Sequence, residues 1–454
     1  MPATDPALAS WRAAFRALVV GADVPRPDGG RLVNLDNAAT TPPLRPVCDT
    51  VEDLLPWYGS IHRGAGYKSG LCSDAYEGAR AEVLRFLDAP AGHTCVFVKH
   101  ATEGLNLLAS RLVGPGDRVL VPAAEHHANL LPWRAAGEVE HVPIDADGAI
   151  VPEALEDALR RRPARVLALS AASNVTGYAP QTGSFVRLAH EHGALVVLDA
   201  AQLVAHRRLH LGAMDDAERP DAVVFSGHKA FAPYGAGAVV LRPELLAGGR
   251  PLLLGGGMAR DVTLTSLDFS PAPASDEGGT PNLVGVVALG VALATLEELG
   301  MPQLEAAEDD LVRVGLAALA TVPGLQLYGP SVDTDRIGVF SFGLDGWDSS
   351  TAATALDRRF GIAVRAGRFC AHPLVDHLRA AAGATGTSDA IRASVAAYTT
   401  PDELLALAEA LRTLQEVAPD QRTAWAEGSG ASGGSGAPPT FDLRRRVRGL
   451  ATTP

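Results

Sequence analysis

The sequence predicts an α/β fold with a mostly parallel β-sheet covered by helices on both faces. Between residues 95 and 245, short runs rich in Val and Leu alternate with segments of helical spacing. These runs are apolar throughout, as strands buried on both faces of a parallel sheet are. The expected strands span residues 118–122, 165–170, 194–202, 221–227 and 237–242.

Two helices after these strands have recognisable ends. The segment 283–300 is a long apolar pattern of helical spacing that stops at a glycine. A later helix has Thr400 as its expected N-cap, Pro401 at the first helical position and Glu403 three residues after the cap. This combination is a capping box, which favours a helix start at that point.

The chain of 454 residues is too long for one compact core. After residue 295 the pattern changes to mixed helices and strands typical of a smaller α+β domain. The C-terminal tail contains a short basic stretch, residues 440–450. Its arginines are either solvated on a disordered end or docked on a partner, and the first interpretation is favoured. We expect an N-terminal helical segment (1–30), a large α/β domain (31–295), a small α+β domain (296–418) that includes the N-terminal segment, and a Gly/Ser-rich linker with a basic tail (419–454).

Composition narrows the functional classes. The net charge of −13 argues against a general nucleic-acid binder, which needs a basic face. No apolar run reaches the roughly 20 residues that span a bilayer, and the N-terminus lacks the pattern of a signal peptide. The cysteines form no CxxC pair, and no histidine motif resembles a metal site. We therefore expect a cytoplasmic protein without a metal, a nucleic-acid partner or a membrane partner.

A carboxylate and a lysine stand at the ends of two predicted strands. Asp199 closes one apolar run, and Lys229 follows the next run along the chain. An unpaired buried charge is prohibitive, so each group needs a partner. The two either form a structural ion pair or hold a cofactor with a carbonyl for the lysine and a ring nitrogen for the aspartate, as pyridoxal 5′-phosphate has. Their spacing leaves both interpretations open.

Further polar residues shift this balance toward the cofactor. Ser226 and His228 flank the lysine with donors suited to a phosphate. Thr102 stands at a helix start, where free N–H groups favour an anion, although an ordinary N-cap is the simpler role. His126 either lies flat against an aromatic cofactor or is merely packed, and Gln202 is placed to reach a ring hydroxyl.

The sequence resembles the class V aminotransferase family of pyridoxal-phosphate enzymes, and within it the SufS-like cysteine desulfurases and selenocysteine lyases. The matching stretches follow the family order nearly to residue 418. They are "NLDNAATTPP" (34–43), "HRGAGYKS" (62–69), "ATEGLNLLA" (101–109), "EHHANLLPWR" (125–134), "SNVTG" (173–177), "LDAAQ" (198–202), "FSGHK" (225–229), "GGTPN" (278–282), "GIAVRAGRFCAHP" (361–373) and "IRASVAAYTTPDE" (391–403).

This resemblance implies the fold type I architecture, with a seven-stranded sheet in the large domain, and a homodimer with shared active sites. It also implies that pyridoxal 5′-phosphate is the cofactor. The implied cofactor residues are Lys229 as the Schiff-base lysine, Asp199 at the pyridine nitrogen, His126 stacked on the ring, Gln202 at the phenolic oxygen, Thr102, Ser226 and His228 at the phosphate, Asn174, and Thr280 at the phosphate of the neighbouring subunit.

The implied reaction is the conversion of L-cysteine to L-alanine, with a persulfide left on Cys370 and a sulfur-acceptor protein as a further partner. Lys229, His126 and Cys370 would be catalytic. Arginine suits a substrate carboxylate because its planar fork makes two parallel bonds. The implied substrate-binding residues are Asn174, Arg365, Arg392 and His62.

The stretch around Cys370 departs from the family pattern. Arg368 and Phe369 stand where related enzymes often have two histidines, and the segment 379–389 is longer than expected. Cys370 is either a small apolar filler or a nucleophile whose thiolate is favoured by Arg365 and Arg368. Another class V reaction therefore remains open, namely transamination, C–S lysis, epimerisation or decarboxylation. A non-catalytic scaffold is disfavoured by the intact lysine, aspartate and arginine.

Overall fold

The computed structural model describes residues 6–26, 29–62, 64–330, 334–384 and 389–427. Its centre is a seven-stranded sheet in which each neighbouring pair is parallel except the two that involve β8. The expected α/β fold is confirmed, and all five expected strands are present. In spatial order the strands are β2 (Thr94–Val98), β8 (Gly237–Leu241), β7 (Ala222–Ser226), β6 (Leu195–Asp199), β5 (Val166–Ser170), β3 (Arg118–Pro122) and β4 (Glu138–Val142).

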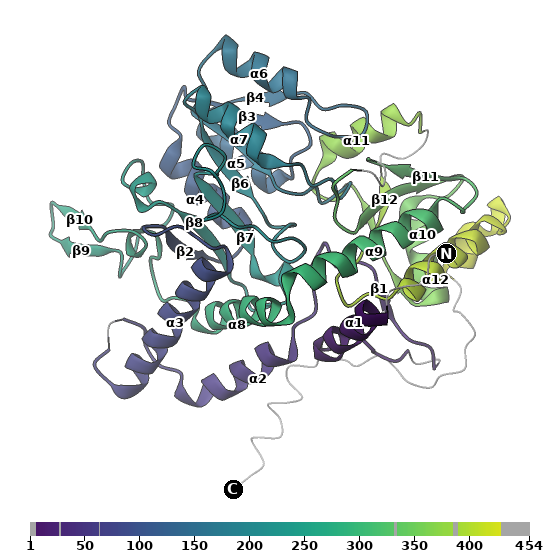
Figure 1. Cartoon of the computed structure of the whole chain (residues 1–454), viewed down its shortest axis with the longest axis horizontal. Helices are drawn as coiled ribbons and strands as arrows, with labels where there is room; N and C mark the ends of the chain where they lie inside the picture. Colours follow the sequence, from purple (N-terminus) through teal and green to yellow (C-terminus); the bar gives the residue numbers. More distant parts are fainter. Residues whose placement is uncertain (1–5, 27–28, 63, 331–333, 385–388, 428–454) are drawn as a thin grey trace, which may run out of the picture.

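Helices cover both faces of this sheet (Figure 1). Successive strand residues point to opposite faces, so Leu120 joins one hydrophobic core while Val119 and Val121 join the other. The face of Val119 is covered by α4 (Ala101–Leu112) and α5 (Leu131–Ala136). The face of Leu120 is covered by α2 (Arg45–Leu54), α3 (Tyr67–Phe86), α6 (Pro152–Arg161), α7 (Thr182–Glu191) and α8 (Leu283–Leu299).

A four-stranded antiparallel sheet forms the smaller part of the molecule. Its core contains Phe340 and Phe342, which are fully buried. The strand order is β11 (Leu325–Tyr328), β12 (Val339–Leu344), β15 (Ala390–Ser394) and β14 (Arg365–Gly367), and the accompanying helices are α9 (Met301–Leu319), α10 (Ser349–Ala355), α11 (His372–Ala381) and α12 (Pro401–Gln415).

Both helix ends expected from the sequence are found. The helix α8 stops where Gly300 takes a φ of 90°, a left-handed conformation that glycine adopts without strain. The helix α12 begins at Pro401, and Oε2 of Glu403 accepts a hydrogen bond of 2.9 Å from the Thr400 N–H. Among the described residues no single helix meets the length and hydropathy criteria for a membrane span; α8 and α9, bent by 80°, meet them only as a pair.

The N-terminal segment contacts both parts of the molecule: Phe15 and Val19 are buried in the core of the large sheet, whereas residues 33–36 lie beside the small sheet. The strand β1 (Val33–Asn34) pairs in parallel with β13 (Ile362–Ala363), and Leu35 is buried in the same core as the small sheet. Asp36 bridges to Ser394 of β15. We expected the large domain to begin at residue 31; by these contacts, residues 33–36 lie with the small sheet instead.

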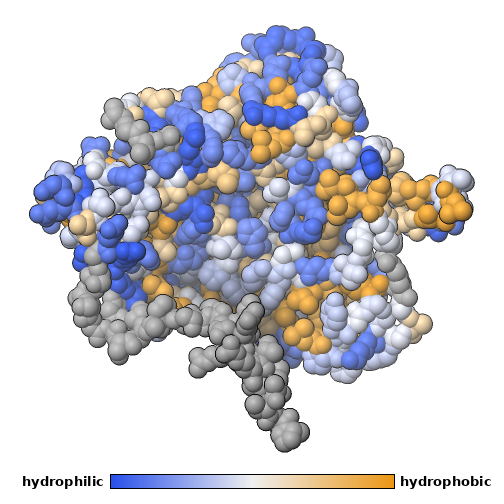
Figure 2. Space-filling view, turned by 180° about the vertical axis from the view of Figure 1, so that it is seen from behind, coloured by the Kyte–Doolittle hydropathy of each residue, from blue (hydrophilic) through white to orange (hydrophobic). Residues whose placement is uncertain are grey.

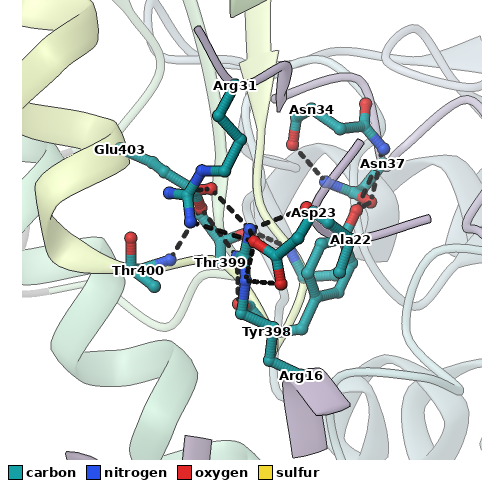
Figure 3. A network of polar contacts seen from close by, with 11 residues as sticks. Arg16, Ala22, Asp23, Arg31, Asn34, Asn37, Tyr398, Thr399, Thr400 and Glu403 are labelled. Atoms are coloured by element: carbon teal, nitrogen blue, oxygen red, sulfur yellow. Dashed lines mark hydrogen bonds and ion pairs between the residues drawn. The ribbon is translucent and has the colours of Figure 1, made fainter. Parts of the chain in front are cut away.

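A buried polar network fixes this segment (Figure 3). Arg16, on α1 (Pro6–Leu18), donates to Asp23 at 2.8 Å and to Glu403 at 3.0 Å. It also donates to the main-chain oxygen of Tyr398 at 3.0 Å. The network therefore joins the N-terminal segment to residues 398–403, which are far away in the sequence.

The C-terminal boundary also differs from the expectation. A linker was expected from residue 419, but residues Pro419–Gln421 and the helix α13 (Arg422–Glu427) are folded. The ring of Trp425 lies 6.5 Å from that of Trp347, at the small core. The Gly/Ser-rich stretch and the basic tail, residues 428–454, lie outside the described residues.

A two-stranded hairpin projects from the large part, at the left of Figure 1. It consists of β9 (Ala259–Val262) and β10 (Leu267–Phe269). Its apolar side chains Val262, Leu264 and Leu267 are exposed, and the space-filling view shows an apolar surface on this projection (Figure 2). Such a concentration of exposed apolar side chains is characteristic of an interaction surface.

Candidate active site

A cavity of about 380 Å³ lies at the carboxyl ends of the parallel strands, between the large sheet and β14–β15. Open α/β sheets usually bind ligands at this edge. Eleven of the thirteen residues singled out in the sequence line it. They are Thr102, His126, Asn174, Asp199, Gln202, Ser226, His228, Lys229, Arg365, Cys370 and Arg392.

Asp199 and Lys229 reach the cavity from neighbouring strands. Asp199 is the last residue of β6, and Lys229 follows β7 in the short 3₁₀ turn Gly227–Lys229. Burial raises the pKa of Asp199 and lowers the pKa of Lys229 to about 8, while their mutual attraction opposes both shifts. Oδ1 of Asp199 accepts a hydrogen bond of 2.9 Å from Ala201 N–H. Both groups remain able to bind a ligand with complementary atoms.

The start of α4 forms one end of the cavity. Its N-cap is His100, whose Nδ1 accepts from Glu103 N–H at 3.3 Å, so the simple N-cap role considered for Thr102 is wrong. Thr102 is the second residue of the helix. Oγ of Ser226 accepts from Ala101 N–H at 2.7 Å and keeps its own proton for another acceptor. A helix start with adjacent hydroxyls suits a phosphate group.

Two imidazoles in the cavity are held neutral. Burial lowers the pKa of His126 to about 3 and that of His228 to about 4, and the Lys229 charge adds to both shifts. Nδ1 of His126 accepts from Ala128 N–H at 3.0 Å, which places the ring proton on Nε2. Gln202 is oriented by the bond from its Nε2 to the oxygen of Ala38, at 2.9 Å.

Arg392 is a buried cation with unused donor capacity. It lies on β15 and donates to the oxygen of Asn174 at 3.0 Å and to Asp36 at 3.2 Å. Its Nε is buried without a hydrogen-bond partner. Arg365 donates to the same Asp36 at 2.8 Å. Two guanidinium groups thus share one carboxylate, which leaves a net positive charge suited to an anionic group.

Cys370 is exposed at the mouth of the cavity. Its carbonyl oxygen accepts from His127 N–H at 2.7 Å. Of the two arginines expected to favour the thiolate, Arg368 forms an ion pair with Asp376. Arg365 shares Asp36 with Arg392, and its charge still attracts the Cys370 thiolate.

Two of the candidates lie elsewhere in this chain. His62 is outside the cavity, where its Nε2 lies 2.9 Å from Oε1 of Glu77 and its ring packs edge-on against Tyr76. It lines a separate cavity near Glu277. Thr280 is exposed in the loop before α8. The single chain therefore does not bring either residue to the site.

Three neighbours of the site were missed in the sequence. Asp36 lies in the quoted stretch 34–43, but nothing local indicated that it binds two arginines. Glu125 and His127 flank His126 in "EHHAN". Glu125 is buried, accepts from Ser170 N–H and Asn129 Nδ2 at 2.8 Å each, and has its pKa raised to about 7 by burial. The available signal was a carboxylate directly after the apolar run 119–124 and next to the candidate His126.

Comparisons with known proteins agree with this geometry. The aminotransferase class-V family matches residues 33–407. A cysteine desulfurase of Klebsiella pneumoniae is 35% identical over 401 residues, covering 86% of this chain and 95% of that protein. One of Synechococcus elongatus is 36% identical over 86% of this chain, but the chain covers only 62% of that protein's length.

Solved structures show the same architecture. The apo cysteine desulfurase of Thermococcus onnurineus has a TM-score of 0.80 at 27% identity, covering 89% of this chain and 98% of that one. The cysteine desulfurase CsdA of Escherichia coli has a TM-score of 0.76 at 31% identity, covering 90% and 99%. With its fold, its cavity and the sequence match over most of its length, this chain belongs to the aminotransferase class-V family.

Proposed function

We propose that this protein is a pyridoxal-phosphate-dependent cysteine desulfurase that converts L-cysteine to L-alanine and keeps the sulfur as a persulfide on Cys370. The observation that carries the proposal is the meeting of Lys229, Asp199, Arg392 and Cys370 around one cavity. The named relatives and solved structures with the same architecture support the choice of reaction.

The donor set of the cavity fits pyridoxal 5′-phosphate. Lys229 would bind its aldehyde carbon, and Asp199 its ring nitrogen. The neutral ring of His126 would stack on it, with Gln202 at the phenolic oxygen. Thr102, Ser226 and His228 would hold the phosphate at the start of α4, with Asn174 nearby. When bound, the cofactor acts as an electron sink for the α-carbon of the amino acid.

The protein's own groups would complete the reaction. Arg392, with Asn174 and Arg365, would hold the substrate carboxylate. Lys229, whose pKa of about 8 leaves it partly neutral near physiological pH, would carry a proton to or from the substrate carbon. The Cys370 thiolate would attack the substrate sulfur, forming an S–S bond while the Cβ–S bond breaks. The substrate Cβ keeps the electron pair of the broken bond and gains a proton, which gives alanine. The transferred sulfur is oxidised and becomes the outer sulfur of the persulfide on Cys370.

We further propose that the protein is a cytoplasmic homodimer with shared active sites, and that a sulfur-acceptor protein removes the persulfide. The exposed apolar hairpin β9–β10 supports a protein interface. In such a dimer Thr280 would reach the partner's phosphate, and His62 would contact the partner's substrate. We also propose that the segments 31–295 and 296–418 act as two domains around the cavity.

The decisive experiment incubates the purified protein with a panel of amino acids, including L-cysteine and L-selenocysteine. Alanine, sulfide, pyruvate and keto acids are all measured. Alanine in step with persulfide on Cys370 supports the proposal. Pyruvate with sulfide would identify a C–S lyase, and a keto acid without alanine an aminotransferase; either result would refute the desulfurase assignment.

A further inference from the structure

Phe369, the residue before the thiol, is packed in the protein interior rather than solvated. It is 7% exposed and belongs to a hydrophobic cluster with Val175, Tyr328 and Leu374. This cluster lies between the small sheet and α11. The side chain therefore anchors the start of the thiol loop in the protein interior.

The same ring lies against Arg392. The guanidinium carbon is 5.0 Å from the centre of the Phe369 ring, within the range of a cation–π contact. Among the residues that the structure describes, Arg392 pairs with one carboxylate, that of Asp36, and shares it with Arg365. Because Asp36 compensates the Arg392 charge only in part, the aromatic face of Phe369 adds a second attraction for the guanidinium. The ring also restricts the orientation of the guanidinium plane.

The main chain of Phe369 is fixed as well. Phe369 and Cys370 have φ values of 50° and 54°, a left-handed conformation uncommon for residues other than glycine. Nδ2 of Asn174 donates to the oxygen of Phe369 at 2.7 Å, and the next carbonyl accepts from His127 at 2.7 Å. These contacts hold the thiol on a turn that the chain would otherwise rarely adopt.

We propose that Phe369 is a positioning residue that couples the substrate-carboxylate arginine to the thiol. Its ring orients Arg392, and its main chain determines the position of Cys370. Arg392 would bind the carboxylate of the substrate and Cys370 would attack its sulfur, so one residue positions the groups that contact both ends of the amino acid. This inference rests on the proposed desulfurase function. Its structural half, the ordering of the turn, is measurable without any turnover.

The test compares three variants. Phe369→Leu keeps an apolar side chain and removes the aromatic face, Phe369→Tyr keeps that face, and Phe360→Leu is the control. Phe360 is a half-buried ring of the smaller part, 6.2 Å from Trp425 and outside the cavity. Measurements are KM and kcat with L-cysteine, thermal unfolding, and hydrogen exchange of the peptide containing residues 368–372 in the cofactor-free protein.

For Phe369→Leu we expect KM to rise about fivefold, the scale of a lost cation–π contact, and exchange of the 368–372 peptide to quicken. Phe369→Tyr should restore both values, while Phe360→Leu changes thermal unfolding alone. Unchanged KM and exchange in Phe369→Leu would overturn the inference, as would equal effects in Phe360→Leu. If wild-type protein makes no alanine, the proposed function fails, and the exchange result still decides whether Phe369 orders the turn.

Discussion

The guanidinium of Arg392 lies 3.2 Å from the carboxylate of Asp36, although 356 residues separate them in the chain. The Arg392 side chain is buried. Burial lowers the pKa of Arg392, while the charge of Asp36 opposes that shift. Because Asp36 also binds Arg365, its single charge is divided between two cations. The local excess of positive charge is the physical basis for placing a substrate carboxylate here.

Replacing Arg392 with alanine should raise KM for the amino acid strongly and leave cofactor attachment intact. Losing a buried charge pair to the carboxylate should cost roughly 2–5 kcal/mol, equivalent to about 30-fold or more in KM. Arg392→Lys keeps the charge but not the planar fork, so its KM should lie between those of the wild type and Arg392→Ala. Steady-state kinetics check this, with the absorbance of the bound cofactor as the control. An unchanged KM would remove Arg392 from the substrate site.

Lys229 should be the attachment point of the cofactor, and attachment should depend on pH. The neutral amine is the reactive form, and burial lowers its pKa to about 8. When cofactor-free protein is mixed with pyridoxal 5′-phosphate, the capture rate should therefore rise with pH around a midpoint near 8. Borohydride reduction and peptide mapping should find the pyridoxyl label on Lys229, and Lys229→Arg should carry none. Label at another lysine would contradict the assignment.

Cys370→Ala should abolish alanine formation from L-cysteine, because no thiolate remains to accept the sulfur. Cofactor binding should be unchanged, since the thiol lies at the cavity mouth. Cys48→Ala is the matched control; Cys48 is half-buried on α2, outside the cavity. Alanine production and mass spectrometry of the persulfide are the measurements. Turnover of Cys370→Ala at the wild-type rate would reduce Cys370 to a packing role.

The network in Figure 3 predicts a stability effect at a distance from the cavity. The side chains of Arg16 and Glu403 are 10% and 4% exposed, so Arg16→Ala would remove a buried ion pair and leave the carboxylate with Arg31, at 3.1 Å, as its remaining cation. Because breaking a buried pair completely typically costs about 3–5 kcal/mol, the loss should lie below about 3 kcal/mol and the urea midpoint should fall accordingly. Arg412→Ala, which breaks the surface pair with Glu409, should change it little. Equal effects of the two variants would show that the network does not stabilise the fold.

The central sheet could be predicted because its signal is local: continuous apolar runs end at Asp199 and Lys229, and strand ends face the ligand edge. The ion-pair partners of the arginines around the cavity could not be predicted from the sequence. Asp36 reaches Arg392 only because β1 pairs with β13 and the residue Asp36 then bridges to β15. Asp376 pairs with Arg368 only because α11 folds back beside it. Phe369 looked like the loss of a histidine, and its contact with Arg392 depends on three-dimensional packing. Thr280 and His62 remain predictions, since they concern a second subunit.

Glu125 should make the stability of the protein depend on pH between about 4.5 and 7. Burial raises its pKa from 4.5 to about 7, so the folded protein binds this proton more tightly than the unfolded chain. The stabilisation is therefore complete below pH 4.5 and is lost as pH rises through 7, by at most about 3 kcal/mol. Glu125→Gln cannot titrate, so its stability relative to wild type should improve between pH 5 and pH 8. Urea unfolding at both pH values measures this, with the exposed Glu409→Gln as the control. A difference that is constant, or that moves the other way, would show that Glu125 is ionised throughout and held by its bonds to Ser170 and Asn129.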